Sequence, residues 1–480
     1  MSYRYQQFIG GSWRDAANGA TWDVLNPATE EVVRTVPFGD AADCRLALDS
    51  AAAALRGWSQ KTSYERGGLL KKAADLMRER AEDLARTTVL ESGKPLLQAK
   101  GEWGVAADLF EWFAEEGKRA YGRWVPPRNP ARRQLVIRQP IGVVGIITAW
   151  NFPAYNVARA TSAALAAGCT VVLRPSEYTP QTAMEMVNIL VEAGIEGGAV
   201  NLINGEPESM GQEMLRNPVC AKIHFTGSQR VGKLLMDGAS KTVKRLSLEL
   251  GGNAPVLIFP DVDIGRVAAS AVLAKFRNAG QVCISPQRFL VQEKIADEFT
   301  ELVTAHVSKI RVGDGLESRT TVGPLINAKQ RDRVEEMVGH ACASGAKVAI
   351  GGKRPAALLK GYFYEPTVVT NVSADNGLFQ AEVFGPVLPI ATFGRADEAI
   401  EVANSTRYGL SAYVWTNDLR TAIRTAERLD FGMVGVNEWA PQTTELPFPG
   451  WKESGIGKEA GAEGLDEYLE TKVIALGGFA

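Results

Sequence analysis

The feature that most restricts the fold is an alternation of short apolar runs with segments of helical pattern. Apolar runs at residues 143–149, 171–173 and 200–203 are separated by helical segments at residues 154–167 and 182–192. Strands that alternate with helices form a mainly parallel sheet, because each helix carries the chain back across the sheet before the next strand begins. The pattern predicts a doubly wound α/β sheet.

A second stretch repeats this alternation and predicts a second α/β unit. Runs at residues 256–258 and 289–291 are followed by helical segments at residues 267–276 and 296–310. A chain of 480 residues has room for two or three packed units, because single cores stop growing at roughly 250–300 residues. Residues 41–118, with apolar residues at helical spacing, predict two or three more helices.

The composition changes abruptly after these helices. Pro126, Pro127, Asn129 and Pro130 form a turn-rich sequence that leads into a strand-like run at residues 134–138. Paired prolines and Asn-Pro break helices and favour turns. The stretch predicts a projecting β-hairpin.

Composition and charge exclude several classes of function. The chain is 45% hydrophobic and 22% charged, which is typical of globular proteins and not of disordered ones. Its net charge is −2, so no overall field attracts nucleic acid or an anionic membrane. The run at residues 141–149 is far shorter than the roughly 20 residues of a membrane-spanning helix. The polar amino end lacks the apolar core of a secretion signal.

Cysteine and histidine usage gives further expectations. The cysteines are Cys44, Cys169, Cys220, Cys283 and Cys342. They are spread widely without a CxxC pair, which argues against a disulfide framework and a zinc site, so we expect no metal and a cytoplasmic location. The histidines are His224, His306 and His340. None has an obvious partner in the sequence, and we expect ordinary structural roles for them.

One cysteine follows a small, glycine-containing segment. The sequence Asn278-Ala279-Gly280-Gln281-Val282-Cys283 comes directly after a predicted helix. Glycine lets the backbone approach a ligand closely, and a thiol there acts as a nucleophile if its surroundings favour the thiolate. A single cysteine is more often a small buried apolar residue, so the assignment of Cys283 as nucleophile depends on its context.

Two other segments supply that context. Glu249 stands between leucines on a strand-like run that ends in Gly251-Gly252. In a partly apolar cleft its pKa would rise, which would suit it to activate water. Asn151 ends an apolar run, where open α/β sheets place ligands, and its amide could donate to an oxyanion. Taken alone, Glu249 would be a surface or ion-paired carboxylate, and Asn151 a turn or helix cap.

These three segments together resemble the aldehyde dehydrogenase superfamily, and the resemblance runs over nearly the whole chain. Residues 225–228 (FTGS), 382–386 (EVFGP) and 447–455 (PFPGWKESG) belong to the same pattern. The resemblance implies an α/β fold of two doubly wound domains plus a small β bridging or oligomerisation arm. The implied parts are an NAD(P)-binding domain (residues 1–118 and 142–250), a catalytic domain (251–447) and the arm (119–141 and 468–480).

The resemblance also implies a mechanism that uses a cysteine thioester. Cys283 would attack the aldehyde carbon, while Asn151 and the Cys283 backbone N–H would hold the oxyanion. Hydride would pass to the nicotinamide. Glu249 would then deprotonate the water that hydrolyses the thioester.

For the cofactor, the resemblance implies a site for NAD or NADP. Its residues would be Trp150, Arg174, Ser176, Glu177, Gly227, Ser228, Gly251, Glu382 and Phe384. Gly227 and Ser228 would start a helix whose N–H groups meet the pyrophosphate. Without the family context, Glu382 to Pro386 would be a strand edge ending in a turn.

The choice between NAD and NADP stays open. The family usually has a lysine where this chain has Arg174. Glu177 accepting from both ribose hydroxyls favours NAD, whereas Arg174 forking onto a 2′-phosphate favours NADP.

Within the superfamily the chain is most similar to succinate-semialdehyde dehydrogenases. Arg159 and Arg277 match the carboxylate-binding pattern of that branch, and Thr443 lies in the substrate loop. Paired guanidinium groups would bind the anionic end of a short aldehyde and place its carbonyl at the sulfur. Taken alone, each arginine would form a surface ion pair. A 2-oxoglutarate-type semialdehyde or a sulfonated aldehyde suits the same groups.

The sequence departs from that branch at several positions. Ser285 replaces a second cysteine found in some members, so no redox switch is expected. Trp439 and Pro441 are expected to reshape the substrate loop, and Pro449 replaces a glycine near the domain junction. A CoA-acylating dehydrogenase or a catalytically silent binding protein of the same fold remains an alternative. The apolar edge at residues 471–476 predicts a homodimer or homotetramer.

Overall fold

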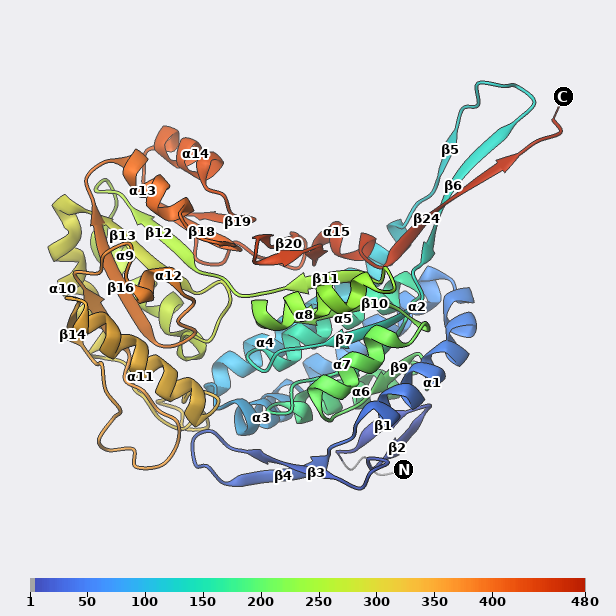
Figure 1. Cartoon of the computed structure of the whole chain (residues 1–480), viewed down its shortest axis with the longest axis horizontal. Coiled ribbons are helices and arrows are strands. Elements are labelled where there is room, and N and C mark those ends of the chain that lie inside the picture. The colour runs from blue at the N-terminus through green and yellow to red at the C-terminus, as the bar shows by residue number, and fades with distance from the viewer. Residues whose placement is uncertain (1–4, 480) are drawn as a thin grey trace.

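Two α/β units form most of the molecule. The computed structural model describes residues 5–479, and Figure 1 shows the two units side by side with a thin arm that projects from one of them. One unit is built on an eight-stranded sheet and the other on a seven-stranded sheet. The predicted pair of α/β sheets is confirmed.

The eight-stranded sheet is parallel at its centre and antiparallel at both edges. In sheet order its strands are β2 (Ser12–Arg14), β1 (Gln7–Ile9), β9 (Val200–Leu202), β8 (Thr170–Arg174), β7 (Val143–Ile147), β10 (Cys220–Thr226), β11 (Arg245–Glu249) and β22 (Gly455–Ile456). The carboxyl ends of β7, β10 and β11 therefore meet at one edge, where ligands bind in open sheets.

Eight helices cover this sheet. They are α1 (Ala41–Gln60), α2 (Ser63–Glu79), α3 (Ala81–Ser92), α4 (Leu96–Glu116), α5 (Pro153–Ala167), α6 (Pro180–Ala193), α7 (Pro207–Arg216) and α8 (Gln229–Ser240). The prediction of two or three helices in residues 41–118 is wrong, because four occur there. Helices α2 and α3 are separated by one non-helical residue, Arg80, and Gly93 ends α3 with a φ of 74°. Such short breaks hardly interrupt the helical pattern.

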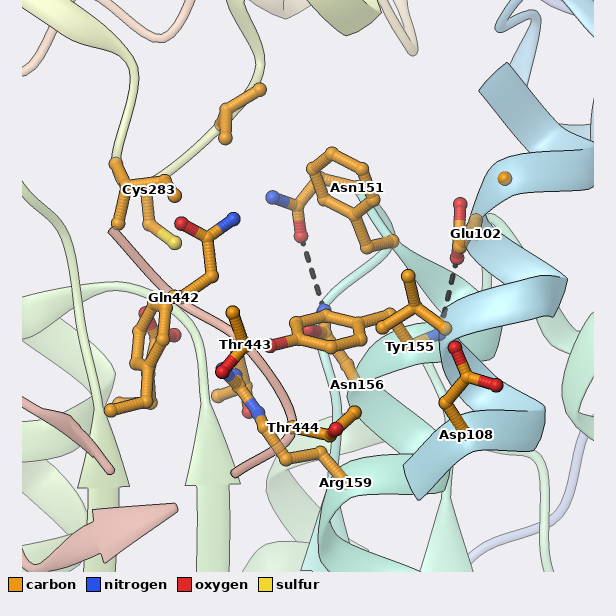
Figure 2. A pocket seen from close by; sticks show the side chains of 18 of the residues that line it. Glu102, Asp108, Asn151, Tyr155, Asn156, Arg159, Cys283, Gln442, Thr443 and Thr444 are labelled. Atoms are coloured by element: carbon orange, nitrogen blue, oxygen red, sulfur yellow. Dashed lines mark hydrogen bonds between the residues drawn. The ribbon is translucent and has the colours of Figure 1, made fainter. Parts of the chain in front are cut away.

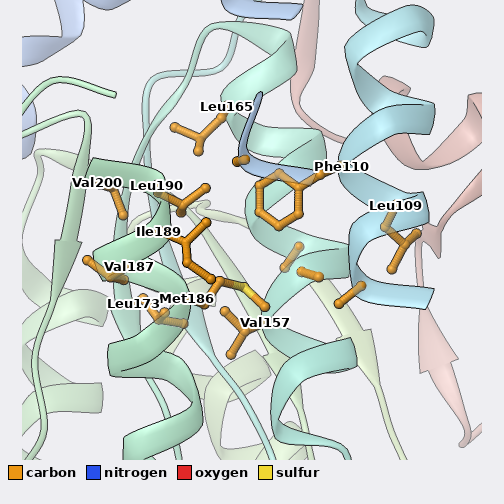
Figure 3. Packing of buried hydrophobic residues seen from close by; sticks show 14 of the residues in the cluster. Leu109, Phe110, Val157, Leu165, Leu173, Met186, Val187, Ile189, Leu190 and Val200 are labelled. Atoms are coloured by element: carbon orange, nitrogen blue, oxygen red, sulfur yellow. The ribbon is translucent and has the colours of Figure 1, made fainter. Parts of the chain in front are cut away.

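The core of this unit is centred on α5. Figure 3 shows Leu109 and Phe110 of α4 and Leu190 of α6 packing around Val157 and Leu165 of α5. All of α5 except Tyr155 is buried, and much of the helix is alanine. Because alanine lets neighbouring elements approach closely, α5 runs through the interior and carries the polar residues at its start into a buried site.

The seven-stranded sheet belongs to the second unit. In sheet order its strands are β14 (Lys347–Ile350), β15 (Thr367–Thr370), β16 (Val387–Phe393), β13 (Pro286–Gln292), β12 (Ala254–Ile258), β18 (Ser411–Trp415) and β19 (Met433–Val436). Its helices are α9 (Ile264–Phe276), α10 (Ala296–Val307), α11 (Ala328–Ala343), α12 (Gly377–Gln380), α13 (Ala396–Asn404) and α14 (Leu419–Arg428). All its pairings except that of β14 are parallel.

The arm is a three-stranded antiparallel sheet. Its strands, in order, are β24 (Leu469–Leu476), β6 (Arg133–Pro140) and β5 (Arg123–Val125). The predicted projecting hairpin is confirmed, and Figure 1 shows the carboxyl-terminal strand lying along it. Val473 on β24 is 69% exposed. Of the described residues, no helix is long and apolar enough to cross a membrane.

Short strands complete the structure. Near the amino end lies the hairpin of β3 (Thr21–Leu25) and β4 (Val32–Pro37). The others are β17 (Tyr408–Gly409), β20 (Phe448–Pro449), β21 (Trp451–Lys452) and β23 (Lys458–Glu459), and α15 (Gly461–Asp466) follows them. Pro449 lies on β20, which pairs with β23.

Candidate active site

Two cavities meet at Cys283. The larger has a volume of about 580 Å³ and is lined by residues of α4 and α5 and by residues 442–445. The smaller, of about 280 Å³, is lined by residues 227–228, 250–251 and others. Both include Asn151, Thr226, Glu249 and Cys283 in their walls. The three residues predicted to carry the chemistry therefore lie together at the junction.

Backbone geometry delivers Cys283 to the junction. Before it, Asn278 and Ala279 have φ angles of 49° and 53°, and Gly280 has a φ of 73°. A Cβ atom on Gly280 would lie 2.1 Å from the carbonyl oxygen of Gly385, so only glycine fits. Burial, with the nearby Glu249 charge, raises the pKa of the Cys283 thiol well above its ordinary value, against the effect of Arg159. Burial therefore favours the neutral thiol over the thiolate.

Glu249 ends β11 and is buried beside this thiol. Burial raises its pKa to about 8; Arg159 lowers it, and Glu459 raises it further. The Cys283 thiol lies close enough to its carboxylate to lower this pKa in part. Its Oε1 atom is buried without a hydrogen-bond partner within residues 5–479. Glu249 thus has the pKa of a general base that works near neutral pH.

Asn151 is held at the junction by hydrogen bonds on all its polar atoms except its backbone N–H. Its Nδ2 donates to the Gln281 carbonyl (3.1 Å), and its Oδ1 accepts from Asn156 Nδ2 (3.3 Å). Its backbone carbonyl accepts from Lys94 Nζ (2.8 Å) and Asn278 Nδ2 (2.9 Å). One Nδ2 hydrogen is left for a ligand, because an amide nitrogen carries two. Figure 2 shows this amide on the Cys283 side of the cavity.

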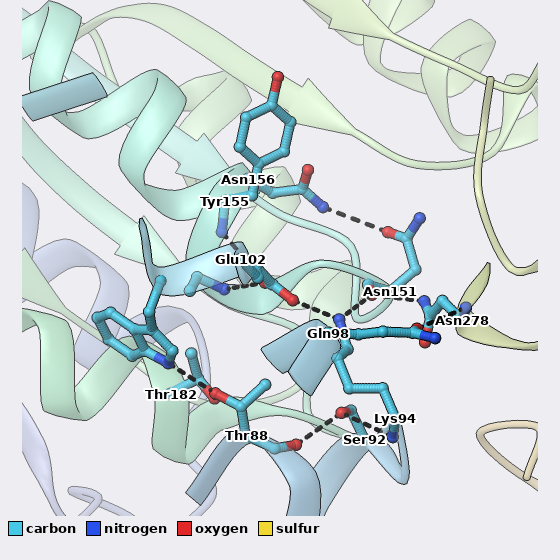
Figure 4. A network of polar contacts seen from close by, with 12 residues as sticks. Thr88, Ser92, Lys94, Gln98, Glu102, Asn151, Tyr155, Asn156, Thr182 and Asn278 are labelled. Atoms are coloured by element: carbon cyan, nitrogen blue, oxygen red, sulfur yellow. Dashed lines mark hydrogen bonds and ion pairs between the residues drawn. The ribbon is translucent and has the colours of Figure 1, made fainter. Parts of the chain in front are cut away.

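A buried ion pair fixes the segment that carries Asn151 (Figure 4). The side chains of Lys94 and Glu102 are each 1% exposed and form an ion pair. Glu102 Oε1 also accepts from the backbone N–H groups of Ala154 (2.7 Å) and Tyr155 (3.2 Å), which begin α5. The sequence reasoning missed both members of the pair, because nothing near Lys94 or Glu102 in the chain indicates that they face Asn151.

The two predicted arginines line the larger cavity, and so does Thr443. Arg277 is exposed, and its guanidinium carbon lies 5.5 Å from the Phe152 ring centre. Arg159 is buried and forms an ion pair of 2.6 Å with Glu459. The pair is internal, not on the surface, and the sequence reasoning did not single out Glu459. Two segments about 300 residues apart had to be brought together to reveal it.

The smaller cavity contains most of the residues predicted to bind the cofactor. They are Trp150, Gly227, Ser228, Gly251, Glu382 and Phe384. Ser228 caps α8 by accepting from the Val231 N–H (3.4 Å), so this helix start faces the cavity. A Cβ atom on Gly251 would lie 2.5 Å from Glu382 Oε2, so the glycine leaves room for that carboxylate. Burial raises the pKa of Glu382 to about 7.

Residues 382–384 are not in a strand, so the plain strand-edge interpretation is wrong. The chain there is irregular, and Phe384 has a φ of 51°. This left-handed backbone ends strand geometry and puts the Phe384 ring against Trp150, edge-on with centres 5.4 Å apart.

The residues predicted to bind the adenosine ribose, Arg174, Ser176 and Glu177, lie outside the linings of both cavities. They stand at and just after the end of β8. Arg174 Nη2 donates to Glu177 Oε2 (2.9 Å) and to the Gly205 carbonyl (2.8 Å). Ser176 is buried, and its hydroxyl accepts from the Tyr178 N–H (3.3 Å). Arg174 and Glu177 therefore bind each other, whereas the sequence led us to expect each of them to bind the cofactor.

Two further expectations need correction. His224 does have partners: its Nε2 lies 2.5 Å from Glu459 Oε1, and its Nδ1 lies 2.9 Å from the Tyr468 hydroxyl. Trp439 does not line either cavity at Cys283. It is half-buried and packs on the rings of Tyr413 and Trp415, with ring centres 5.3 and 4.7 Å away, against the core of the second unit. Pro441 is also absent from both linings.

Comparison with known proteins agrees with this arrangement. The model of the Aldehyde dehydrogenase family matches residues 13–474. The chain belongs to this family. It is an oxidoreductase that acts on the aldehyde group, and the expected nicotinamide cofactor, NAD or NADP, is confirmed at that level.

Individual relatives are similar over almost their full length. Glutarate-semialdehyde dehydrogenase of Pseudomonas putida is 42% identical, over 99% of this chain and 98% of its own. Succinate-semialdehyde dehydrogenase [NADP(+)] of Escherichia coli is also 42% identical, with the same coverage. The crystal structure of an NAD-dependent aldehyde dehydrogenase from Sinorhizobium meliloti superimposes with a TM-score of 0.96 at 40% identity, covering 98% of this chain and 94% of that one.

Proposed function

We propose that this protein oxidises a short anionic aldehyde, such as succinate or glutarate semialdehyde, to the carboxylic acid through a thioester on Cys283. The observation that carries the proposal is the position of this thiol between two cavities of different character. One contains two arginines, and the other contains a helix start, glycines and a buried carboxylate. Such a site lets one sulfur face an anionic aldehyde on one side and a nicotinamide on the other.

The arginines of the larger cavity support an anionic substrate. Arg277 is exposed on its wall. Arg159 uses Nη2 for its ion pair, and its Nε and Nη1 atoms are buried without a hydrogen-bond partner in residues 5–479. Buried donors without a partner are costly, and a substrate carboxylate would satisfy them. The two relatives named above are semialdehyde dehydrogenases, which supports the same class of substrate.

The residues at the junction have different roles in the reaction. In its unprotonated form, Glu249 accepts the proton of the Cys283 thiol, which frees the thiolate to attack the carbonyl carbon. The Asn151 amide and the Cys283 backbone N–H then stabilise the oxyanion. Once the thioester has formed and Glu249 has released the thiol proton to solvent, its carboxylate takes a proton from the water that releases the acid. Thr443 would contact the aldehyde from the exposed loop.

The smaller cavity suits a nicotinamide cofactor. Gly227 and Ser228 would receive its pyrophosphate at the start of α8, where backbone N–H groups favour anions. Glu382 would bind the nicotinamide ribose, with Trp150, Gly251 and Phe384 around it. The cofactor supplies the acceptor for hydride. Arg174, Ser176 and Glu177 would contact the adenosine ribose.

The decisive experiment is an assay of reduced cofactor by absorbance. Purified protein is mixed with succinate semialdehyde, glutarate semialdehyde or neutral butanal, with NAD or NADP and without CoA. We expect free acid to form, with the anionic aldehydes preferred. Cys283→Ser is expected to lower kcat/KM by about 10³-fold or more, since nucleophile replacements have effects of this size. Unchanged kcat/KM for the anionic aldehydes in both Arg159→Ala and Arg277→Ala would contradict an anionic substrate.

We further propose that the arm joins subunits into a dimer or tetramer in a reducing cytoplasm. The exposed apolar side chains on β24 support the first part, because a partner strand or sheet would cover them. All five cysteines are free, which suits a reducing compartment. Light scattering of the full chain and of Val473→Asp tests the assembly, and a monomeric wild-type protein would contradict it.

A further inference from the structure

Behind Arg159 lies a buried row of titratable side chains, which we call the Glu459 cluster. Its members are Arg159 on α5, Glu459 on β23, His224 on β10 and Tyr468 just before β24. All four are at most 6% exposed. Arg159 is the member that lines the larger cavity.

A single carboxylate serves two partners in this cluster. Glu459 Oε2 lies 2.6 Å from Arg159 Nη2, and Glu459 Oε1 lies 2.5 Å from His224 Nε2. Although burial acts to raise it, the pKa of Glu459 is held below its ordinary value by Arg159 and His224. Glu459 is therefore a shared anion, with one oxygen for each neighbour.

Tyr468 determines which ring nitrogen of His224 carries the hydrogen that faces Glu459. Its hydroxyl lies 2.9 Å from His224 Nδ1. If the hydroxyl donates to Nδ1, the neutral ring carries its hydrogen on Nε2, where it faces Glu459. In this arrangement Tyr468 orients the ring so that Nε2 faces Glu459 Oε1 at ion-pair distance.

Because Glu459 is shared with His224, Arg159 forms fewer contacts with this carboxylate than an arginine usually does. A guanidinium and a carboxylate that meet without competition usually form two parallel hydrogen bonds. Here Glu459 gives Arg159 one oxygen only, and Arg159 Nε and Nη1 are left buried without a hydrogen-bond partner within the described chain. The Tyr155 hydroxyl is also near the guanidinium and interacts with it electrostatically. An anion in the larger cavity would complete the coordination of Arg159.

We propose that His224 is a positioning residue for substrate selectivity: by holding one oxygen of Glu459, it keeps Arg159 from pairing fully with that carboxylate and leaves the guanidinium available to an anionic aldehyde. The inference rests on the proposed function, since it assumes that Arg159 binds the anionic end of the substrate.

Other charges close to the cluster have their own partners. Lys222, on the same strand as His224, lies 5.3 Å from the Tyr468 ring centre, but its Nζ donates to Ser247 (2.6 Å) and Glu467 (3.2 Å). Glu249, at the end of β11, interacts electrostatically with both Arg159 and the Cys283 thiol. Neither takes the place of His224 at Glu459.

The test compares KM for an anionic and a neutral aldehyde of equal length, succinate semialdehyde and butanal. His224→Phe keeps a ring but removes the donor to Glu459. We expect KM for succinate semialdehyde to rise about tenfold, because Glu459 then pairs with Arg159 through both oxygens. We expect kcat, and KM for butanal, to stay within about twofold. A purely structural role would affect the two aldehydes alike.

Further variants make the test specific. His224→Gln retains an N–H donor and should restore most of the selectivity. Tyr468→Phe frees Nδ1 and should give a smaller rise in KM, about threefold, again for the anionic aldehyde alone. His340→Phe, an exposed histidine on α11, is the matched control and should change nothing. If His224→Phe does not fold, Tyr468→Phe and His224→Gln decide the matter through the same pair of KM values.

Two different failures can be told apart. If the wild-type enzyme shows no preference for the anionic aldehyde, the proposed function is wrong. If the wild type shows the preference and Arg159→Ala abolishes it, yet His224→Phe and Tyr468→Phe both leave it intact, then the role of His224 is wrong and the proposed function stands.

Discussion

The two cavities that meet at Cys283 obtain their shapes in different ways. The smaller is formed by close approaches of backbone, such as Gly251 leaving space for Glu382 and the capped start of α8. The larger is lined by side chains from distant parts of the chain, and one of them, Arg159, is held from behind by Glu459. A glycine requirement is a local property of the chain. Compensation of a buried charge depends on the tertiary structure.

This difference predicts separate effects of substitution. Changes in the smaller cavity should act on the cofactor, changes in the larger one on the aldehyde, and changes at the shared residues on the chemical steps. The following variants test that division, from the largest expected effect to the smallest.

Glu249→Gln tests a shared residue. Without the base, hydrolysis of the thioester should slow by about 10²–10⁴-fold, while KM values for aldehyde and cofactor change little. In the wild type the rate should rise with pH through about 8, because the working form of Glu249 is unprotonated and its pKa is raised to about 8 by burial. Steady-state kinetics from pH 6 to 9.5 measure both effects. If the variant keeps the wild-type rate and pH profile, Glu249 is not the catalytic base.

Asn151→Ala tests the second shared residue. Loss of one oxyanion donor typically lowers kcat by about 10²–10³-fold. Single-turnover measurement of cofactor reduction should show the loss in the first chemical step. Equal binding of NAD or NADP by variant and wild type, measured by calorimetry, serves as the control. A large loss of cofactor affinity would contradict the assignment to chemistry.

Lys94→Met tests whether the buried pair acts through Asn151. Leaving Glu102 buried without its partner should cost about 3–5 kcal/mol of stability, measured by urea unfolding. We expect kcat to fall by about 10–100-fold, because the Asn151 amide is no longer held in position. In an Asn151→Ala background the same change should scarcely alter kcat. Additive losses in the double variant would show that Lys94 acts elsewhere.

Glu177→Ala tests the cofactor side alone. The change releases Arg174 from its hydrogen bond with Glu177, so the guanidinium can turn to a 2′-phosphate. The ratio of kcat/KM for NADP to that for NAD should rise about tenfold, the size expected for one charged hydrogen bond. KM for the aldehyde should not change. A change in KM for the aldehyde would contradict the proposal that the two cavities bind cofactor and aldehyde independently.

Much of the fold and of the site was predictable because its signals are local. The alternation of strands and helices indicated both sheets. The glycine before Cys283 predicted a close approach of the backbone to a ligand, and the structure shows the close approach at Gly280 against the Gly385 carbonyl. The apolar run before Asn151 placed its side chain at the carboxyl end of a strand, and the family resemblance joined it with Glu249. Each of these signals lies within a few residues of the feature that it predicts.

The remaining features were not predictable because they depend on contacts between distant segments. Glu459 lies on a two-residue strand, β23, and only tertiary structure brings it to Arg159 and His224. Trp439 was expected at the pocket because it belongs to the loop that the family resemblance assigns to the substrate. Its large ring instead packs against the core of the second unit. The boundary between α2 and α3 could not be seen in the sequence, because only one residue, Arg80, interrupts the helical pattern.

The raised pKa of the Cys283 thiol affects how the enzyme withstands oxidants. Peroxide reacts with thiolates and only slowly with thiols, so burial that raises this pKa disfavours oxidation of the sulfur. Two residues further on, Ser285 presents a hydroxyl that accepts from Lys275 Nζ (3.2 Å). Position 285 therefore supplies no sulfur with which an oxidised Cys283 could form a disulfide.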